Sequence, residues 1–182
     1  MKGILVVSAT KAEAAHVADR YDVLITGIGK VTAAVAVTAA LARYPEGARP
    51  LVVNIGTAGA LHGHHGGLYV PSTVINHDIS SKVLRSLGHP VADALSVDEG
   101  DGTVLATGDT FVSDAEVRDA LAARADLVDM EGFAVASAAC HMGARARLVK
   151  YVSDHADDSA MDWPNQIDVA GRALAQWLEE RF

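Results

Sequence analysis

Three acidic residues stand close behind hydrophobic runs, and their spacing is the clearest sign of chemistry in this chain. Glu13 follows the first apolar run, Glu131 ends the segment Val-Asp-Met-Glu, and Asp154 follows the apolar stretch 147–152. In an α/β sheet such positions are the carboxyl ends of strands, which form the edge where ligands bind. Carboxylates gathered in a cleft usually act on a substrate rather than stabilise the fold. We therefore expect the three side chains to share one crevice and to carry out acid–base chemistry.

Two of these residues also have a purely structural interpretation. Asp154 could be the N-cap of a helix, and Glu131 could lie in the first turn of a helix, where an acidic side chain complements the helix dipole. Taken alone, each residue fits the structural interpretation as well as the chemical one. Their occurrence together with Glu13 and with the small residues at 57–59 favours a shared site.

The elements expected to position these residues are short strands that alternate with helices. Apolar runs, whose hydrophobicity is typical of a sheet covered on both faces, predict strands over residues 4–7, 23–26, 51–55, 69–75, 104–107, 127–128 and 147–152. Helical patterns lie over residues 9–18, 30–44, 114–124, 131–142 and 166–181. This alternation predicts an α/β fold with a largely parallel sheet.

The least regular part of the chain is the segment 76–102. Its pattern predicts a short helix at 82–87 followed by an exposed crossover. No linker, repeat or low-complexity tract divides the chain, so we expect a single domain over residues 1–182.

Composition limits the partners and the compartment of the protein. The chain has 15 basic and 23 acidic residues and a formal charge of −8, which argues against a nucleic-acid partner because that surface needs a basic stripe. No apolar run approaches the roughly 18–20 residues of a membrane span, so no membrane partner is expected. The single cysteine, Cys140, excludes an internal disulfide and suits the reducing cytoplasm. We expect a cytoplasmic protein that acts on a small molecule.

Two glycine-containing segments could contact a ligand through their backbone. Gly27-Ile-Gly29-Lys30 follows a strand and opens a helix, but it lacks the third glycine of a dinucleotide loop and the Ser/Thr of a Walker A loop. A tight strand-to-helix turn is the favoured interpretation, and a backbone contact to an anion or ribose is the alternative. In Asn54–Gly59, small residues directly after a strand would let N–H groups approach a ligand, and Thr57 adds a hydroxyl.

Three histidines, His62, His64 and His65, lie in a glycine-rich loop. They lack the i, i+4 spacing of a helical metal site and have no Cys or acidic residue beside them in the sequence. A solvated loop is the favoured interpretation, and we expect neither a metal nor another cofactor.

Six motifs in order give the chain its resemblance to the nucleoside phosphorylase/nucleosidase superfamily, closest to the methylthioadenosine/adenosylhomocysteine nucleosidases. Each motif alone is weak, but the ordered set is specific. The motifs are the N-terminal strand leading to Glu13, Gly27–Val31, Asn54–Gly59, Ala106–Val112, Val128–Glu131 and Val152–Asp154. The resemblance implies a three-layer α/β/α sandwich with a mixed, largely parallel central sheet, and it implies a homodimer.

The resemblance also implies a role for each acidic residue. Asp154 looks like the general acid that protonates, or hydrogen-bonds, the purine N7, with Ser153 orienting it. Glu131 looks like the acceptor of hydrogen bonds from the ribose 2′- and 3′-hydroxyls, with Met130 against the sugar. Glu13 matches the acid that positions or activates the attacking water. Because it is a ligand for hydroxyl donors, Glu131 is expected to stay ionised.

The remaining substrate contacts are implied in the same way. Phe111 would stack on the base, and the Val112 backbone would read the edge of the base. Thr57 occupies the place of a serine near the nucleophile site, and Ala58 and Gly59 follow it in the same segment.

Two departures from the family pattern bear on specificity. Lys150 stands where the nucleosidases have an arginine that helps to fix the acid, and a lysine cannot copy the bidentate fork of an arginine. The chain is also shorter than family members, largely within 76–102, a region that in the family helps to form the pocket for the 5′ substituent and the dimer contact. A different or unsubstituted nucleoside is therefore an alternative to a 5′-methylthio substrate.

Cleavage of an N-glycosidic bond explains why carboxylates would be needed. The ribose gains oxocarbenium character while negative charge flows to the leaving base. An acid at the base relieves the second change, and carboxylates around the sugar stabilise the first. The sequence therefore predicts a purine nucleoside N-ribosyl hydrolase, with a substrate of the methylthioadenosine/adenosylhomocysteine type or a related purine nucleoside.

Two alternatives stay open at the level of sequence. A phosphorylase of the same superfamily would need cations for phosphate, whereas Lys11 and an anionic Glu13 occupy the loop after the first strand. A nucleoside-binding or sensing protein that has lost turnover is the other alternative, and Lys150 and the short 76–102 region are its main support.

Overall fold

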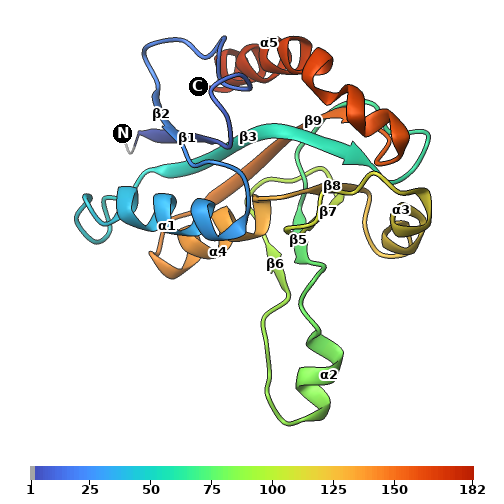
Figure 1. Cartoon of the computed structure of the whole chain (residues 1–182). Coiled ribbons are helices and arrows are strands. Elements are labelled where there is room, and N and C mark those ends of the chain that lie inside the picture. Colours follow the sequence, from blue (N-terminus) through green and yellow to red (C-terminus); the bar gives the residue numbers. More distant parts are fainter. Residues whose placement is uncertain (1–2) are drawn as a thin grey trace.

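The structure, a computed structural model, describes residues 3–182, without the side chains of Ser159 and Pro164, and is built around one nine-stranded sheet (Figure 1). The strands are β1 (Ile4–Ser8), β2 (Asp22–Ile25), β3 (Leu51–Ala60), β4 (Gly67–Tyr69), β5 (Thr73–Asn76), β6 (Ala94–Ser96), β7 (Val104–Thr107), β8 (Leu127–Asp129) and β9 (Ala146–Asp154).

The sheet is mixed and largely parallel, as predicted. Its main path runs β2-β1-β3-β8-β7-β5-β6, and β9 pairs with β3 and β4. The antiparallel pairs are β3 with β8, β4 with β9, and β5 with β6; the other five pairs are parallel. The long strands β3 and β9 pair along most of their length and form the centre of the sheet.

Helices cover both faces of the sheet. They are α1 (Lys30–Leu41), α2 (Ser81–Ser86), α3 (Ala115–Ala122), α4 (Gly132–His141), α5 (Trp163–Arg181) and the 3-10 turn η1 (Asp158–Asp162). Helix α5 lies on one face and α1 and α4 lie together on the other (Figure 1). This arrangement confirms the predicted three-layer α/β/α sandwich. Within residues 3–182, no helix is both long and apolar enough to cross a membrane.

Small side chains let the helices lie close to the sheet. On one face, buried residues of α1 and α4 such as Ala33, Val37 and Ala138 pack in one cluster with the buried side chains of the strands. On the other face, Leu174 and Leu178 of α5 pack in a second cluster with strand residues. The apolar strands are thus covered on both sides, which is why their sequences read as continuous hydrophobic runs.

The helix predicted over residues 9–18 is wrong. This segment forms turns, with Ala15 N–H donating to Ala12 O and Val17 N–H to Ala14 O. Thr10 and Glu13 make the reciprocal bonds of a helix start, with Thr10 N–H donating to the Glu13 carboxylate and Glu13 N–H donating to Thr10 Oγ1. The Glu13 carboxylate is also bonded to Thr57 on β3, and the turns that follow have i→i+3 bonds in place of the i→i+4 bonds of an α-helix.

Other boundaries also differ from the prediction, and α1 ends at Leu41, three residues before the predicted end. The predicted strand 69–75 is divided into β4 and β5, with Pro71, which cannot donate to a ladder, lying between them. Strand β3 does not stop at Ile55 but continues to Ala60, so the small residues 56–59 lie within a strand rather than after one. Helix α5 begins at Trp163, three residues before the predicted start.

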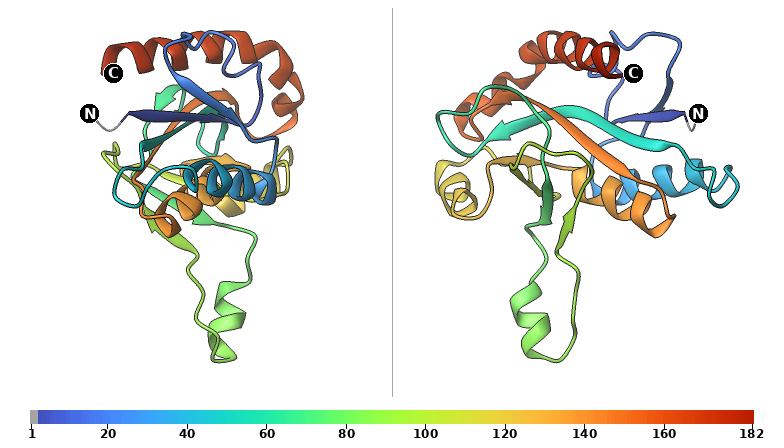
Figure 2. Two further views of the ribbon diagram at one scale, coloured as in Figure 1. Left: turned by 90° about the vertical axis from the view of Figure 1, so that its left-hand side faces the viewer. Right: turned by 180° about the vertical axis from the view of Figure 1, so that it is seen from behind.

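Residues 77–93 project away from the sheet as an arm that carries α2 (Figures 1 and 2). The short helix predicted at 82–87 is confirmed within one residue, and β5 and β6 close the base of the arm as an antiparallel pair.

Candidate active site

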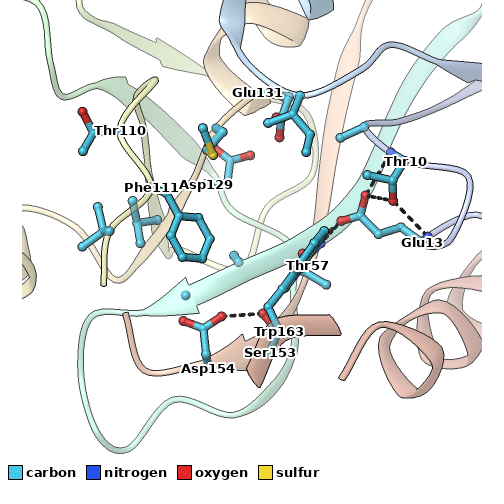
Figure 3. A pocket seen from close by; sticks show the side chains of 17 residues that line it. Thr10, Glu13, Thr57, Thr110, Phe111, Asp129, Glu131, Ser153, Asp154 and Trp163 are labelled. Carbon is cyan, nitrogen blue, oxygen red and sulfur yellow. Dashed lines mark hydrogen bonds between the residues drawn. The ribbon is translucent and has the colours of Figure 1, made fainter. Parts of the chain in front are cut away.

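A pocket of about 160 Å³ lies where the ends of β7, β8 and β9 meet the second half of β3 (Figure 3). It is lined by Ala9, Thr10, Glu13, Ile28, Thr57, Ala58, Gly59, Thr110, Phe111, Val112, Val128, Asp129, Met130, Glu131, Ser153, Asp154 and Trp163. The expected meeting of Glu13, Glu131 and Asp154 in one crevice is therefore confirmed. All other residues that the sequence proposed for substrate binding also line this pocket, except Lys150.

Glu13 is held by a dense set of hydrogen-bond donors. Its Oε1 accepts from Thr57 N–H and Thr57 Oγ1, both at 2.9 Å, and its Oε2 accepts from Thr10 Oγ1 at 2.8 Å and Thr10 N–H at 3.1 Å. The residue is only 3% exposed. Gly56 makes room for the carboxylate, because a Cβ there would stand 3.2 Å from Oε1. Glu13 is thus a buried acceptor with a fixed orientation beside the pocket.

Glu131 lies at the N-cap position of α4, but its side chain makes no capping bond. Instead, Oε1 accepts from Gly29 N–H at 2.8 Å, across from the start of α1. Burial raises the pKa of the Glu131 carboxyl to about 7, with the like charge of Asp129 adding to the rise and Lys150 opposing it. Burial therefore works against the expectation that Glu131 stays ionised in the free pocket.

The backbone bonds at the start of α1 decide between the two interpretations of the Gly27–Lys30 segment. Gly29 has a φ of 99° and donates to Glu131, and Lys30 N–H donates to Asp109 Oδ1 at 2.8 Å. These amides bind carboxylates of the chain itself. The segment is the tight strand-to-helix turn that the sequence favoured, and it fixes Glu131.

Asp154 is held on both of its carboxylate oxygens. Ser153 Oγ donates to Oδ2 at 2.7 Å, and Ala156 N–H donates to Oδ1 at 2.9 Å. A Cβ at Gly59 would stand 3.0 Å from Oδ1, so the glycine lets the acid approach β3 closely. The side chain faces the pocket across from Phe111 (Figure 3). Asp154 ends a strand and does not cap a helix, because the next α-helix after Asp154 begins only at Trp163.

Lys150 is the one proposed substrate contact that the structure does not bring into the pocket. It is 1% exposed, and Nζ lies 2.9 Å from both Asp129 Oδ2 and Asn54 Oδ1. Lys150 is on β9 four residues before Asp154, and its ammonium group lies between acceptors on β3 and β8. A lysine needs such partners when it is buried. The ammonium group contacts Asp129 and Asn54 and makes no ion pair with Asp154.

Asp129 joins this buried pair to the start of α4. Its Oδ2 also accepts from Gly132 N–H at 2.9 Å, and its Oδ1 accepts from Thr107 Oγ1 at 2.5 Å. Asp129 thereby ties β7, β8, β9 and α4 together directly behind Met130 and Glu131. Asp129 lies within the motif Val128–Glu131, but the sequence predicted no role for it.

One wall of the pocket is apolar. Phe111 is 47% exposed, which leaves its ring available at the pocket mouth, while Val112 is nearly buried. Ile28 also lines the pocket and is 53% exposed. A flat hydrophobic ligand could pack here while its polar edge faces Asp154.

Thr10 and Trp163 were missed as site residues. The spacing Thr-x-x-Glu at 10–13, which favours reciprocal bonds between the hydroxyl and the acid, could have identified Thr10. Trp163 is brought in by the early start of α5, for which the sequence carried no clear signal.

The histidine loop lies outside this pocket. The ring centroids of His62, His64 and His65 are 4.3–5.5 Å apart, and no group of three or more His, Cys, Asp or Glu residues within the described part of the chain is arranged to hold a metal. The prediction of a solvated loop is wrong for His65, which is 8% exposed and stacks on Tyr69. Burial lowers the pKa of His65, and the neighbouring His64 lowers it further.

The sequence and the structure were compared with those of known proteins. Residues 16–180 match the sequence profile of the Phosphorylase superfamily. The chain belongs to that superfamily. The resemblance found from the six motifs is confirmed.

Individual members of the phosphorylase superfamily show the same relation. A 5′-methylthioadenosine/S-adenosylhomocysteine nucleosidase of Shewanella halifaxensis is 27% identical over an alignment 183 positions long, which covers 85% of this chain and 78% of that protein. The crystal structure of the Helicobacter pylori nucleosidase of the same name superimposes with a TM-score of 0.85 at 20% identity, covering 98% of this chain and 96% of the other. The futalosine hydrolase of H. pylori gives a TM-score of 0.83 at 21% identity, with 97% and 95% covered. At these identities the two structures establish a shared fold.

Proposed function

We propose that the protein is a purine nucleoside N-ribosyl hydrolase, a nucleosidase that cleaves the N-glycosidic bond between base and ribose. The observation that carries the proposal is the convergence of Glu13, Glu131 and Asp154 on one pocket with an aromatic wall. Its substrate is a nucleoside of the methylthioadenosine/adenosylhomocysteine type or a related purine nucleoside. The names of the relatives, two nucleosidases and a futalosine hydrolase, point to the same reaction class.

At the base end, Asp154 is the general acid. A carboxyl held by Ser153 on one oxygen and by Ala156 N–H on the other has a fixed direction, and that direction is toward the pocket. With the base packed on Phe111, Asp154 would donate to N7 and relieve the negative charge that develops on the leaving group. One such proton transfer contributes about 10²–10⁴-fold to a rate.

At the sugar, Glu131 accepts from the ribose 2′- and 3′-hydroxyls. Hydroxyl donors favour the ionised carboxylate, so substrate binding draws Glu131 into its charged form although burial raises its pKa in the free pocket. The ionised Glu131 then lies beside the ribose as oxocarbenium character develops, and Met130 packs against the sugar.

On the opposite side of the sugar, Glu13 positions the attacking water. Four donors from Thr10 and Thr57 fix the carboxylate, so the acceptor does not have to reorganise when the water is activated. The water attacks C1′, the C1′–N9 bond breaks, and the products are the free base and free ribose derivative.

Hydrolysis is favoured over phosphorolysis by the charge of the pocket. Its lining within residues 3–182 holds four carboxylates and no Lys or Arg, and the buried ammonium of Lys150 is already paired with Asp129. Phosphate would meet anionic side chains with no cation to hold it. A neutral water meets no such repulsion.

We further propose a cytoplasmic homodimer. The single cysteine suits a reducing compartment. For the dimer, the support is an apolar surface at the start of α1, where Ile28, Val31 and Val35 are 53%, 73% and 65% exposed. Val31 and Val35 are one helical turn apart and share one face. Exposed apolar side chains gathered on one element are typical of an interface.

The proposed reaction is tested by chromatography of purified protein with a panel of nucleosides, each with and without phosphate. The panel holds methylthioadenosine, adenosylhomocysteine, adenosine, inosine, a futalosine-type nucleoside and uridine. Base release without phosphate supports the hydrolase, and the best substrate defines the 5′ group. Base release only with phosphate would assign a phosphorylase, and binding without any release would assign a nucleoside sensor.

A further inference from the structure

Trp163 is part of the pocket although no chemical role follows from its sequence context. It is the first residue of α5, it is partly buried, and it lines the pocket beside Thr57 and Ser153 (Figure 3). Its indole Nε1 lies 2.8 Å from Thr57 Oγ1. Thr57 Oγ1 in turn lies 2.9 Å from Glu13 Oε1. The three side chains form a chain of hydrogen bonds that starts on α5 and ends on the buried carboxylate.

The direction of this chain is fixed by the chemistry of its members. An indole N–H can only donate, whereas a hydroxyl has one proton to donate and lone pairs to accept with. Thr57 Oγ1 must therefore accept from Trp163. Its single proton is then free to point at Glu13 Oε1, and the donor capacity of Thr57 is committed to the carboxylate.

We propose that Trp163 is a positioning residue for Glu13, acting through the Thr57 hydroxyl. This inference rests on the proposed hydrolase, in which Glu13 orients the attacking water. By occupying the acceptor side of Thr57, the indole N–H prevents the hydroxyl from rotating toward the sugar or the water. The hydroxyl stays on Oε1, together with Thr57 N–H, and the carboxylate keeps one orientation throughout the reaction.

The segment that follows β9 also connects Trp163 to Asp154. Residue 163 follows η1, which connects the end of β9 to α5. The chain that carries Asp154 therefore continues into the residue that steadies Glu13 on the opposite side of the sugar. The acid and the water-positioning carboxylate are thus held by the two ends of one short segment.

The test removes only the N–H and keeps an aromatic ring. Trp163→Phe is expected to lower kcat by about three- to tenfold with KM changed less than twofold, since one hydrogen bond is lost and the apolar wall remains. Trp177→Phe is the matched control, because Trp177 is a buried tryptophan on the same helix that packs against Phe182 and is absent from the pocket lining. It is expected to lower stability and leave kcat unchanged.

A double-mutant cycle with Thr57 separates positioning from general damage to the fold. Thr57→Val removes the relay, so adding Trp163→Phe to it should cause no further fall in kcat, whereas Thr57→Ser keeps the hydroxyl and should retain the effect of Trp163→Phe. Independent effects of the two substitutions, or an unchanged kcat in Trp163→Phe, would overturn the inference.

A spectroscopic measurement tests the contact without any catalysis. The indole ¹H–¹⁵N resonance of Trp163, assigned by its loss in Trp163→Phe, should move in Thr57→Val and stay near its position in Thr57→Ser. A resonance that ignores Thr57→Val would contradict the relay even if the wild-type protein is a hydrolase. Failure of the proposed function itself is distinct, because the wild-type protein would then release no base without phosphate.

Discussion

At the scale of single residues, the site is a set of carboxylates that the fold keeps in different surroundings. Glu13 is saturated with donors, Asp154 is held by a hydroxyl and a backbone amide, and Glu131 has one backbone donor and a raised pKa. Different surroundings let chemically similar groups take different roles in one reaction. The types and order of these residues were readable from the sequence. The raised pKa was not, because it depends on burial and on Asp129 and Lys150.

The pH dependence of the reaction should report Glu131. Its carboxyl has a pKa of about 7 in the free protein, and the ionised form is the stronger acceptor for the two ribose hydroxyls. Because kcat/KM reports the free enzyme, it should rise as pH increases through about 7. Steady-state rates between pH 5.5 and 8.5 with a substrate whose own ionisation lies outside that range would check this. A flat profile across neutrality would contradict the assignment of Glu131.

Removing the charge of Glu131 should lower the activity and raise the stability of the protein. A carboxyl whose pKa is raised on folding holds its proton longer in the folded state, so the free energy of unfolding falls as pH rises from about 4.5 to about 7. Glu131→Gln should therefore be more stable than the wild type by about 1–3 kcal/mol at pH 8, and about equally stable near pH 4.5. Denaturant unfolding at the two pH values measures the difference. An equal effect at both would show that Glu131 carries no such cost.

At the scale of elements, the site depends on close approaches that only small residues permit. Gly56 and Gly59 of β3 leave room for Glu13 and Asp154, and the turn before α1 brings Gly29 N–H onto Glu131. The sequence showed these segments to be small and placed them next to strands. It did not show that β3 runs through residues 56–59, because a run of Gly, Ala and Thr looks more like a turn than a strand.

The turn at Gly29 offers a sharp test of this dependence. Gly29→Ala strains a position with φ of 99° and disturbs the donor to Glu131, so substrate affinity should fall along with stability. Gly47→Ala is the matched control, with a φ of 79° and nothing within 4 Å of the added Cβ. Both variants should lose about 1–3 kcal/mol of stability, and Gly29→Ala should lose more, because φ of 99° with ψ of 158° is a conformation found almost only at glycine. Only Gly29→Ala should weaken binding of a ribonucleoside, measured by calorimetry, and a similar loss of binding in both would contradict the role of the turn.

The sequence-based predictions were wrong where polar side chains form contacts that the hydrophobic pattern does not show. The alanine-rich segment 9–18 has helical composition, yet it forms turns in which Glu13 is bonded to Thr57 on β3, a contact that the local sequence pattern does not reveal. Lys150 was expected at the substrate because it replaces a family arginine. Its actual place beside Asp129 depends on packing between strands that are distant in the sequence.

At the scale of the whole molecule, the predicted three-layer sandwich is confirmed, because alternating apolar strands and helices have few other ways to cover a largely parallel sheet. What the chain alone could not show is how the outer surfaces are used. The arm at 77–93 and the apolar start of α1 both face away from the core. We propose that the α1 surface is the dimer interface.

The dimer makes a simple prediction. Val35→Asp should convert the protein to a monomer, because it places a charge within the proposed apolar interface. Val169→Asp on α5, where the valine is also exposed, should leave the mass unchanged. Analytical ultracentrifugation at micromolar concentration measures both. A wild-type protein that sediments as a monomer would contradict the proposed dimer.

The central claim is that water, and not phosphate, attacks the sugar. The most direct measurement is a reaction in H₂¹⁸O without phosphate, followed by mass spectrometry of the released sugar at early times. Free sugar placed in the same water without the protein corrects for exchange of the anomeric oxygen with solvent. We expect free base and one ¹⁸O atom on the anomeric carbon, with both products lost in Glu13→Gln and Asp154→Asn. Base release that requires phosphate and leaves ¹⁸O out of the sugar would contradict the account.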